Sequence, residues 1–285
     1  MPTKPQGDTP STTERLGALE KFPLARLVMA PGEIALSFVG YLGELAMLAV
    51  DTVVSIVVAP FRWGLLLRQI AEIGFRSQTV VIVTGMFTGA VLTAQTFFQF
   101  SKLGMATAVG SVVSVSVFRE LGPTMTGLMV AGRVGASIAA EIGTMKVTEQ
   151  IDALRALGVH PVDYLIVPRV LALLISMPLL VAESVALALF ASYLVGTQLL
   201  DISAPYFITN MVRYTGMRDI KMALVKGFCF AVIIAIVSCH QGLNAKEGAV
   251  GVGRAPTEAI VISSLSILIV NFFLTFALNM IFPAG

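Results

Sequence analysis

Two charged residues stand alone inside a long apolar stretch of the sequence. Positions 118–123 read FRELGP, and neither residues 103–118 nor residues 121–132 contain Asp, Glu, Lys or Arg. A charge in the centre of a bilayer is costly, so ionisable residues there usually serve a function. Arg119 can bind a phosphate or a carboxylate through two parallel hydrogen bonds, and it can equally pair with Glu120 or another carboxylate. A third interpretation is a charge pair at the end of an interfacial helix.

The glycine and the proline that follow predict a break in the helix. Pro123 has no N–H to donate to the carbonyl of Arg119, four residues back, so the helix is kinked or weakened at Gly122 and Pro123. In lipid that carbonyl must find another partner, and the break should therefore face protein or a water-filled cavity. Adjacent residues on a helix point about 100° apart, so Arg119 and Glu120 need not pair with each other. We favour a structural and gating role for them over direct capture of a charged ligand.

Motifs for catalysis and nucleotide binding are missing from the sequence. It contains no G-x-x-x-x-G-K-[ST] loop, no H-E-x-x-H and no G-x-S-x-G, and His160 and His240 are 80 residues apart. We therefore expect no enzyme, no metal and no cofactor bound by this chain, and no nucleic-acid binding, since the basic residues form no cluster. An ion-coupled secondary transporter of a small amphiphile is the alternative, with a relay through Arg119, Glu120 and Glu183. A lipid-modifying membrane enzyme ranks last.

The composition is that of an integral membrane protein. Hydrophobic residues make up 56% of the 285 residues and charged residues only 13%, whereas soluble domains carry about 25%. A helix of about 20 apolar residues crosses a bilayer. The sequence therefore predicts an all-α transmembrane domain over 77–285 with five spans, at about 79–100, 105–132, 164–199, 222–243 and 258–282.

The residues before the first span suit the membrane surface. We expect 1–30 to be a disordered cytoplasmic tail and 31–76 to form interfacial and elbow helices. Three arginines lie among apolar residues of the elbow, Arg62, Arg68 and Arg76. Upstream, three carboxylates fall within about 20° of one another on a helical wheel, Glu33, Glu44 and Asp51. Such a stripe suits a helix in the interface or a crossing helix packed on polar partners.

A short amphipathic helix is predicted between the second and third spans, within 138–158. Its apolar positions follow helical spacing at Val147, Ile151, Leu154 and Gly158, and Gly158 with Pro161 should end it. It either joins two spans or docks its apolar ridge into a groove of a soluble partner. The basic residues of the loops place this segment in the cytoplasm, with the N-terminus inside and the C-terminus outside.

The first span offers a close-packing face and an aromatic surface. Gly85 and Gly89 are four residues apart, a spacing that lets two helices approach closely. Near the end of the span, Phe97 and Phe98 are suited to acyl chains, or are ordinary lipid-facing residues.

Four separated motifs in this order resemble the MlaE/YrbE family, the permease subunits of Mce-associated ABC lipid transporters. They are FRELGP, AGRVGASIAAEIGTMKVTEQIDAL at 131–154, GVHPVDYLIVPRVLA at 158–172 and EGAVGVGRAPTEAIVISSLSILIVNFFLT at 247–275. The resemblance covers roughly residues 30–282. Family members often carry Asp-Phe in the last motif where this chain has Asn271-Phe272, which puts a charged role there in doubt.

The resemblance implies a homodimer of five-span protomers in the bacterial inner membrane, with interfacial N-terminal helices. A separate cytoplasmic ABC ATPase would bind ATP and Mg²⁺, and a periplasmic Mce-domain (MlaD-like) protein would sit on the opposite face. Membrane lipid would bind at the dimer interface. By motif position, the resemblance implies that lipid binds at Ala94, Phe97, Arg119, Glu120 and Leu121. We add the neighbouring Phe98 to this set. The residues carried over to ATPase coupling are Glu141, Met145, Val147, Glu149, Ile151, Asp152, Leu154 and Leu157.

Overall fold

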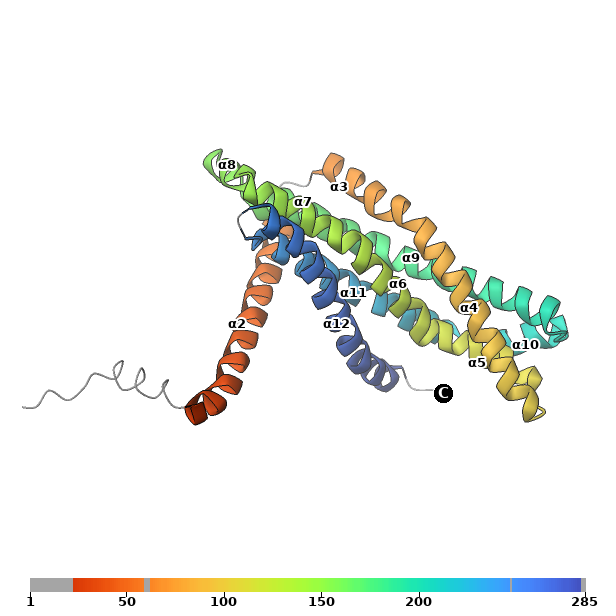
Figure 1. Ribbon diagram of the computed structural model, residues 1–285. Helices are drawn as coiled ribbons and strands as arrows, with labels where there is room; N and C mark the ends of the chain where they lie inside the picture. The colour runs from red at the N-terminus through yellow and green to blue at the C-terminus, as the bar shows by residue number, and fades with distance from the viewer. Residues whose placement is uncertain (1–22, 59–61, 247, 283–285) are drawn as a thin grey trace, which may run out of the picture. The chain divides into compact units, whose positions relative to one another are not determined.

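The computed structural model describes residues 23–58, 62–246 and 248–282, and every regular element in those ranges is a helix (Figure 1). The predicted all-α fold is therefore confirmed. The chain divides after Leu48 into two units, and the helix α2, Pro23–Val58, belongs to both. At 1.5 Å per residue its 36 residues extend for about 54 Å. Its part Leu36–Val58 is long and apolar enough to cross a membrane.

The second unit contains five long helical runs and two short helices, α8 and α10. The first run, Trp63–Lys102, consists of α3 (Trp63–Ile70), the π-helical turn η1 (Ala71–Phe75) and α4 (Arg76–Lys102). After the 3-10 turn η2 (Ala106–Ala108), the second run consists of α5 (Val109–Ser116), η3 (Val117–Leu121), α6 (Gly122–Val130), η4 (Ala131–Gly135) and α7 (Ala136–Val147). The short α8 covers Gln150–Ala156, and the next run consists of η5 (Val162–Ile166), α9 (Val167–Leu194) and η6 (Val195–Leu199). The chain continues with α10 (Ala204–Tyr214), α11 (Met217–Leu243) and α12 (Ala249–Ile281).

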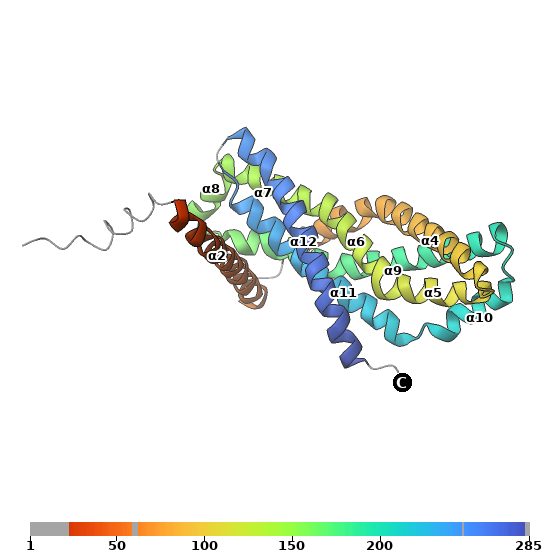
Figure 2. The same ribbon diagram turned by 60° about the horizontal axis from the view of Figure 1, so that its bottom comes forward.

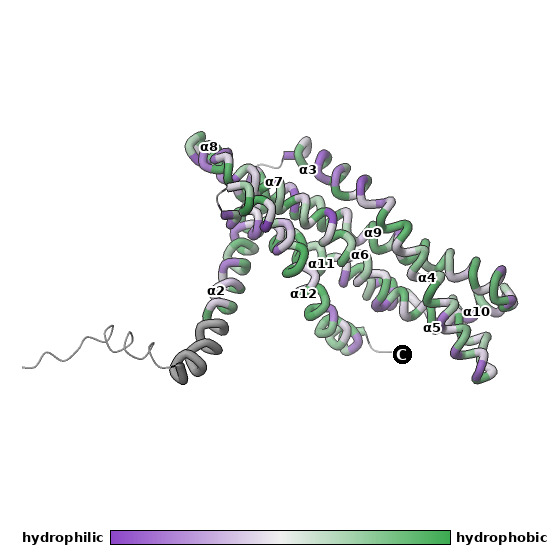
Figure 3. The backbone as a smooth tube through the Cα atoms, in the orientation of Figure 1, coloured by the Kyte–Doolittle hydropathy of each residue, from purple (hydrophilic) through white to green (hydrophobic). Residues whose placement is uncertain are grey.

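Successive runs are antiparallel, so the connections alternate between two ends of the bundle. The short helix α10, which follows the third run, contacts α5 and η2 at the start of the second run, and the first run contacts the end of the third through α4 and η6. In Figures 1 and 2, α8 lies at the opposite end from α10. Figure 3 shows hydrophilic residues on α3 and at the start of α4, a mixture of hydrophilic and hydrophobic residues on α8, and hydrophobic ones along α9. We refer to the two ends of the bundle as the α8 end and the α10 end.

Five described helices are long and apolar enough to cross a membrane, and the chain is a multi-pass membrane protein. They are Leu36–Val58, Trp63–Lys102, Val162–Leu199, Met217–Leu243 and Ala249–Ile281. The number of such helices equals the predicted number of spans, but the helices are not the same five segments. The predicted span 105–132 lies mostly in the run Val109–Val147, which is not one of the five. Its glycines, serines and charges are tolerated because it contacts α4, α9, α11 and α12 along its length.

The packing of α4 on α9 follows from one stripe of α4. Its buried residues recur every four positions, at Ser77, Val81, Gly85, Gly89 and Thr93. A Cβ at Gly85 would stand 2.7 Å from the backbone oxygen of Ser184, and one at Gly89 would collide with that of Ala188. Only hydrogen fits at these two positions, so the expected close-packing face of Gly85 and Gly89 exists and its partner is α9.

The predicted amphipathic helix 138–158 is two helices in the structure. Its first part is α7, which continues the second long run to Val147. The direction changes at Glu149, whose φ of 59° is left-handed, and α8 then begins at Gln150. Gly158, with φ of 75°, ends α8 as predicted, and its N–H donates to the carbonyl of Arg155 at 3.0 Å. Periodicity alone did not separate the two helices because Thr148 and Glu149 do not interrupt the apolar spacing.

Candidate functional site

The break at FRELGP takes the form of a π-helical turn. The turn η3 ends at Leu121, directly before Gly122 and Pro123, and the N–H of Gly122 donates to the carbonyl of Val117, five residues back. The carbonyl of Arg119, which Pro123 cannot pair with, accepts a hydrogen bond from Lys226 Nζ at 2.7 Å. The break therefore faces protein, and a buried lysine of α11 supplies the missing donor.

Glu120 binds two further helices. One of its carboxylate oxygens, Oε2, lies 2.9 Å from Lys226 Nζ and accepts a hydrogen bond of 2.9 Å from Asn271 Nδ2. The other, Oε1, lies 2.9 Å from the hydroxyl of Thr275, which in turn accepts a hydrogen bond from Lys226 at 2.9 Å. Lys226 belongs to α11 and Asn271 and Thr275 to α12, so one carboxylate connects η3 to both helices.

Arg119 points to a different partner from Glu120. Its Nε donates to Asp219 Oδ1 at 2.5 Å, and Asp219 Oδ2 accepts the N–H of Gly216, which caps the start of α11. Asp219 is 2% exposed and Lys226 0%. The side chains of Arg119 and Glu120 are 30% and 38% exposed. We call the following residues the Lys226 cluster: Arg119, Glu120, Asp219, Lys226, Asn271 and Thr275.

The Lys226 cluster has two cations and two carboxylates, so its formal charges balance. Lys226 is nine residues into α11, about 14 Å from the start of the helix, whereas Asp219 lies in its first turn. In a helix of 27 residues that crosses a hydrocarbon layer of about 30 Å, the depth of Lys226 is within that layer. Nε of Arg119 donates to Asp219, whereas the outer guanidinium nitrogens of this half-buried side chain make no hydrogen bond or ion pair with another described side chain. They remain available to a ligand with phosphate or carboxylate oxygens.

The predicted lipid-binding residues lie on two neighbouring elements. Ala94 and Phe97 of α4 are half-buried and Phe98 is exposed, and the two phenylalanine rings meet edge to face with centroids 6.1 Å apart. Leu121 is half-buried on η3 beside the two charges. Since α4 contacts α5 and α6, which flank η3, both groups belong to the same part of the bundle.

The predicted coupling residues are divided between α7 and α8. Glu141 is on α7, where its Oε2 lies 2.9 Å from Nη2 of Arg169, a 4% exposed residue of α9. Met145 and Val147 are half-buried, and Glu149 and Asp152 are exposed. On α8, Ile151 is 0% exposed and Leu154 half-buried, whereas Leu157, just after its end, is 78% exposed. Ile151 therefore packs inside the chain and Leu157 presents an outward apolar side chain, and the coupling role of this segment stays a prediction.

Four residues of the Lys226 cluster were not predicted: Asp219, Lys226, Asn271 and Thr275. Asp219 and Lys226 flank the predicted start of the fourth span, where charges are ordinarily solvated. Their separation of seven residues, two helical turns, places both on one face of α11 and was the available signal. At position 271 the structure shows an amide donating to a carboxylate, so a neutral donor suits this position.

Within the described ranges, no group of three or more His, Cys, Asp or Glu residues could hold a metal ion. The site is therefore described by its charges, hydrogen bonds and apolar surface.

Comparison with known proteins shows which family the chain belongs to. The family described as permease MlaE matches residues 66–277. A probable ABC transporter permease protein of Rickettsia felis is 43% identical over 252 residues, 88% of this chain and 97% of that protein. One of Synechocystis is 41% identical over 209 residues, 73% of this chain and 80% of that protein. The chloroplastic protein TRIGALACTOSYLDIACYLGLYCEROL 1 of Arabidopsis thaliana is 36% identical over 228 residues, 80% of this chain and 65% of that protein. The extent of these matches shows that the chain belongs to the MlaE family of ABC transporter permeases.

Proposed function

We propose that the chain is the membrane-spanning subunit of an ABC transporter that moves phospholipid or a related lipid. An ABC transporter permease implies an ATPase partner. In this proposal that cytoplasmic partner binds ATP and Mg²⁺, and the chain itself catalyses no reaction. The lipid passes between the bacterial inner membrane and a periplasmic Mce-domain protein, and the permease works as a homodimer.

The observation that carries the proposal is the partly exposed pair of Arg119 and Glu120 inside the hydrocarbon layer of a chain of this family. In each of the two ion pairs, Arg119 with Asp219 and Glu120 with Lys226, one member is buried and the other is partly exposed. A purely structural ion pair is expected to be buried on both sides. One relative also bears the name of a glycolipid, trigalactosyldiacylglycerol. An amphiphile with a polar head would suit a partly open charged cluster with aromatic residues of α4 in the same part of the bundle.

In the proposed binding mode, the headgroup and the tails of the lipid contact different elements. Ala94, Phe97 and Phe98 of α4 offer apolar surface to acyl chains, and Leu121 extends that surface on η3. The outer nitrogens of Arg119 lie beside it and can take a phosphate oxygen. Glu120 holds α11 and α12 to η3, so a ligand that competes for Arg119 or Glu120 alters the connection among three helices.

The ion-coupled alternative depends on a relay through Arg119, Glu120 and Glu183. Glu183 is half-buried on α9 and makes no hydrogen bond or ion pair with another described residue, so the structure does not connect it to the Lys226 cluster. That alternative predicts transport by the isolated chain in liposomes under a proton or sodium gradient without ATP.

The proposal is tested by reconstituting the chain with its ATPase and Mce-domain partners and following the transfer of labelled phospholipid. We expect ATP-dependent transfer, and we expect Arg119→Ala to reduce it strongly. Arg213→Ala, an exposed arginine at the α10 end, is the matched control and should transfer lipid normally. Mass spectrometry of lipid that co-purifies with the complex identifies the cargo. Full transfer by a folded Arg119→Ala variant would refute the role of Arg119, and ATP-independent transport would refute the proposal as a whole.

A further inference from the structure

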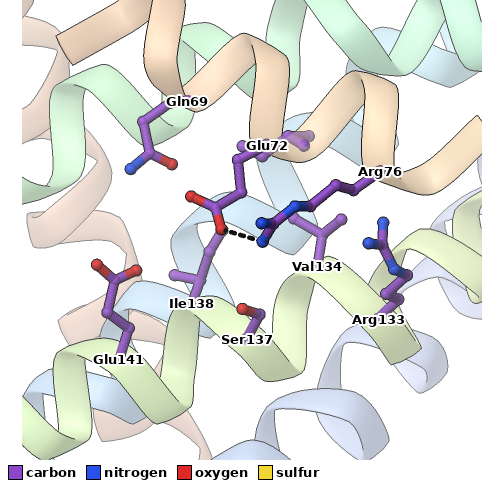
Figure 4. Close-up of a pocket in the computed structure, with 9 residues that line it drawn as sticks. Gln69, Glu72, Arg76, Arg133, Val134, Ser137, Ile138 and Glu141 are labelled. Atoms are coloured by element: carbon purple, nitrogen blue, oxygen red, sulfur yellow. Dashed lines mark hydrogen bonds and ion pairs between the residues drawn. The ribbon is translucent and has the colours of Figure 1, made fainter.

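A second polar site lies at the α8 end, between the first two long runs. A cavity of about 290 Å³ opens there between α3, η1 and the start of α4 on one side and η4 and α7 on the other (Figure 4). Its wall contains Ile73, Val134 and Ile138 together with the polar side chains of Gln69, Glu72, Arg76, Arg133, Ser137 and Glu141. Figure 4 shows Arg76 and Arg133 on the two opposite sides of the cavity, with the guanidinium group of Arg76 turned toward Glu72.

The charges around this cavity leave one arginine without a carboxylate. Glu72 Oε1 is bonded to Arg76 Nη1 at 2.9 Å. Glu141 Oε2 is bonded to Arg169 Nη2 at 2.9 Å. Among the described residues, no carboxylate oxygen lies within 4.0 Å of the Arg133 guanidinium nitrogens. Each carboxylate thus has its own cation, and Arg133 gives the cavity a surplus positive charge.

Arg133 is also held in place by a buried hydroxyl. Its Nη1 donates to Ser77 Oγ at 2.7 Å, and the Ser77 hydroxyl donates onward to the carbonyl of Ile73 at 2.6 Å. Ser77 is only 1% exposed, so its position is fixed by the packing of α4. A long side chain that is already oriented loses less conformational entropy when it binds a ligand. The other N–H groups of the half-buried Arg133 remain as donors.

The cavity lies at the depth of lipid headgroups. Arg76 lies 26 residues, about 39 Å, from Lys102 at the other end of α4. With the charged Lys102 in one interfacial layer, a hydrocarbon thickness of about 30 Å places Arg76 in the opposite one. The bond between Arg133 and Ser77 places Arg133 at the same depth. Phe97 is 21 residues further along α4, about 32 Å away. The cavity is therefore separate from the proposed lipid path.

We propose that this cavity binds a phosphate group, held by Arg133 and by Arg76 on the opposite side. Arginine is suited to phosphate because its planar fork donates two parallel hydrogen bonds to phosphate oxygens. The ligand is either the headgroup of a phospholipid in the leaflet at the α8 end or free phosphate. This site goes beyond the transport function proposed above and does not depend on which lipid is transported.

The test measures lipid retention by the full-length chain, without transport. The chain is purified in detergent, incubated with dioleoyl phosphatidic acid or with dioleoylglycerol, and its bound lipid is counted by native mass spectrometry. The two lipids share their acyl chains and differ by the phosphate. We expect phosphatidic acid to be retained at least about tenfold better, as for the gain of a charge-assisted hydrogen bond. Equal retention of the two lipids would overturn the proposal.

Variants locate the binding. In a chain that also carries Arg119→Ala, so that the proposed lipid path holds no phosphate, we expect Arg133→Gln to abolish the preference for phosphatidic acid and Arg76→Gln to weaken it. Ser77→Ala should also weaken it, because the guanidinium of Arg133 loses its anchor. Arg68→Gln, an exposed arginine of α3 outside the cavity, is the control and should retain the preference. Unchanged preference in a folded Arg133→Gln variant would contradict the proposal. If that variant does not fold, the preference is measured in Arg76→Gln, an exposed position, and an unchanged preference there would contradict the proposal.

Two further measurements are needed. The first distinguishes a lipid headgroup from free phosphate, and the second distinguishes this cavity from the site at Arg119. Displacement of phosphatidic acid by millimolar inorganic phosphate would show that free phosphate shares the cavity, whereas retention against it identifies the lipid headgroup. Arg119→Ala should keep the preference at this cavity even where it abolishes transfer. A loss of the preference in Arg119→Ala but not in Arg133→Gln would overturn the assignment to this cavity and leave the transport proposal intact.

Discussion

At the scale of single residues, Lys226 is the centre of the charged network inside the membrane. Its ammonium group contacts the carbonyl of Arg119, the carboxylate of Glu120 and the hydroxyl of Thr275, so all three of its protons have acceptors. A buried charge is tolerated only when it is paired and hydrogen-bonded. The pairing explains how a lysine can be 0% exposed in a membrane helix.

Replacing this lysine should destabilise the protein. We expect Lys226→Met to lower the stability by about 3 kcal/mol, because it removes the cation opposite Glu120 and leaves the Arg119 carbonyl without its donor. The thermal transition of the detergent-solubilised chain measures the change. Lys221→Met, an exposed lysine of the same helix, is the control and should leave the transition within about 0.5 kcal/mol of the original.

A second variant tests whether the loss comes from the ion pair. Adding Glu120→Gln to Lys226→Met removes the unpaired carboxylate, so the double variant should be more stable than the sum of the two single effects predicts, by about 1 kcal/mol or more. Strict additivity of the two substitutions would show that Lys226 and Glu120 are not energetically coupled.

At the scale of elements, the contact of α4 with α9 depends on the absence of side chains at Gly85 and Gly89. We expect Gly89→Ala to lower the stability by about 1 to 3 kcal/mol, because the new methyl group meets the backbone of Ala188 and the helices must separate. Gly253→Ala, in α12, has nothing within 4 Å of the new Cβ and should be neutral or slightly stabilising. Thermal unfolding of both variants side by side checks the difference, and an equal effect of the two would contradict the close approach.

The short helix α8 offers a different kind of test. We expect Leu157→Asp to keep the fold, since this side chain is 78% exposed, and to abolish co-purification of the ATPase if the α8 end is the docking surface. Leu103→Asp, equally exposed at the α10 end, is the matched control and should retain the ATPase. Ile151→Asp, in contrast, should unfold α8, because a charge would replace a fully buried isoleucine. Normal ATPase binding by Leu157→Asp would exclude this surface.

At the scale of the whole molecule, the all-α fold and most spans could be predicted, because they depend on long apolar stretches. The Lys226 cluster could be predicted only in part. The lone charges at Arg119 and Glu120 were visible, and so was the need of the Arg119 carbonyl for a partner. Which residue supplies that partner depends on how α11 and α12 pack on η3, 107 residues away in the case of Lys226. Local periodicity carries no information on such a contact, and it also failed to show that Ile151 faces inward.

The alternation of the helical runs predicts on which side of the membrane each connection lies. We expect Leu157→Cys and Leu103→Cys, each in a chain with Cys229 and Cys239 replaced by Ala, to react with a membrane-impermeant maleimide from opposite sides. A tag at the N-terminus decides the role of α2: accessibility from the side of residue 157 means that Leu36–Val58 lies in the interface, and accessibility from the other side means that it crosses. Labelling of positions 103 and 157 from one side would contradict the antiparallel arrangement.

The hydrogen bond from Lys226 to the Arg119 carbonyl has a consequence for the evolution of the sequence. Pro123 creates the unpaired carbonyl and Lys226 satisfies it, so each residue is tolerated partly because the other is present. A lineage that regains a backbone N–H at position 123 restores the ordinary helical acceptor and relaxes selection on the lysine. We therefore expect substitutions at positions 123 and 226 to occur together across descendants of a common ancestor, as a correlated pair separated by 103 positions along the gene product.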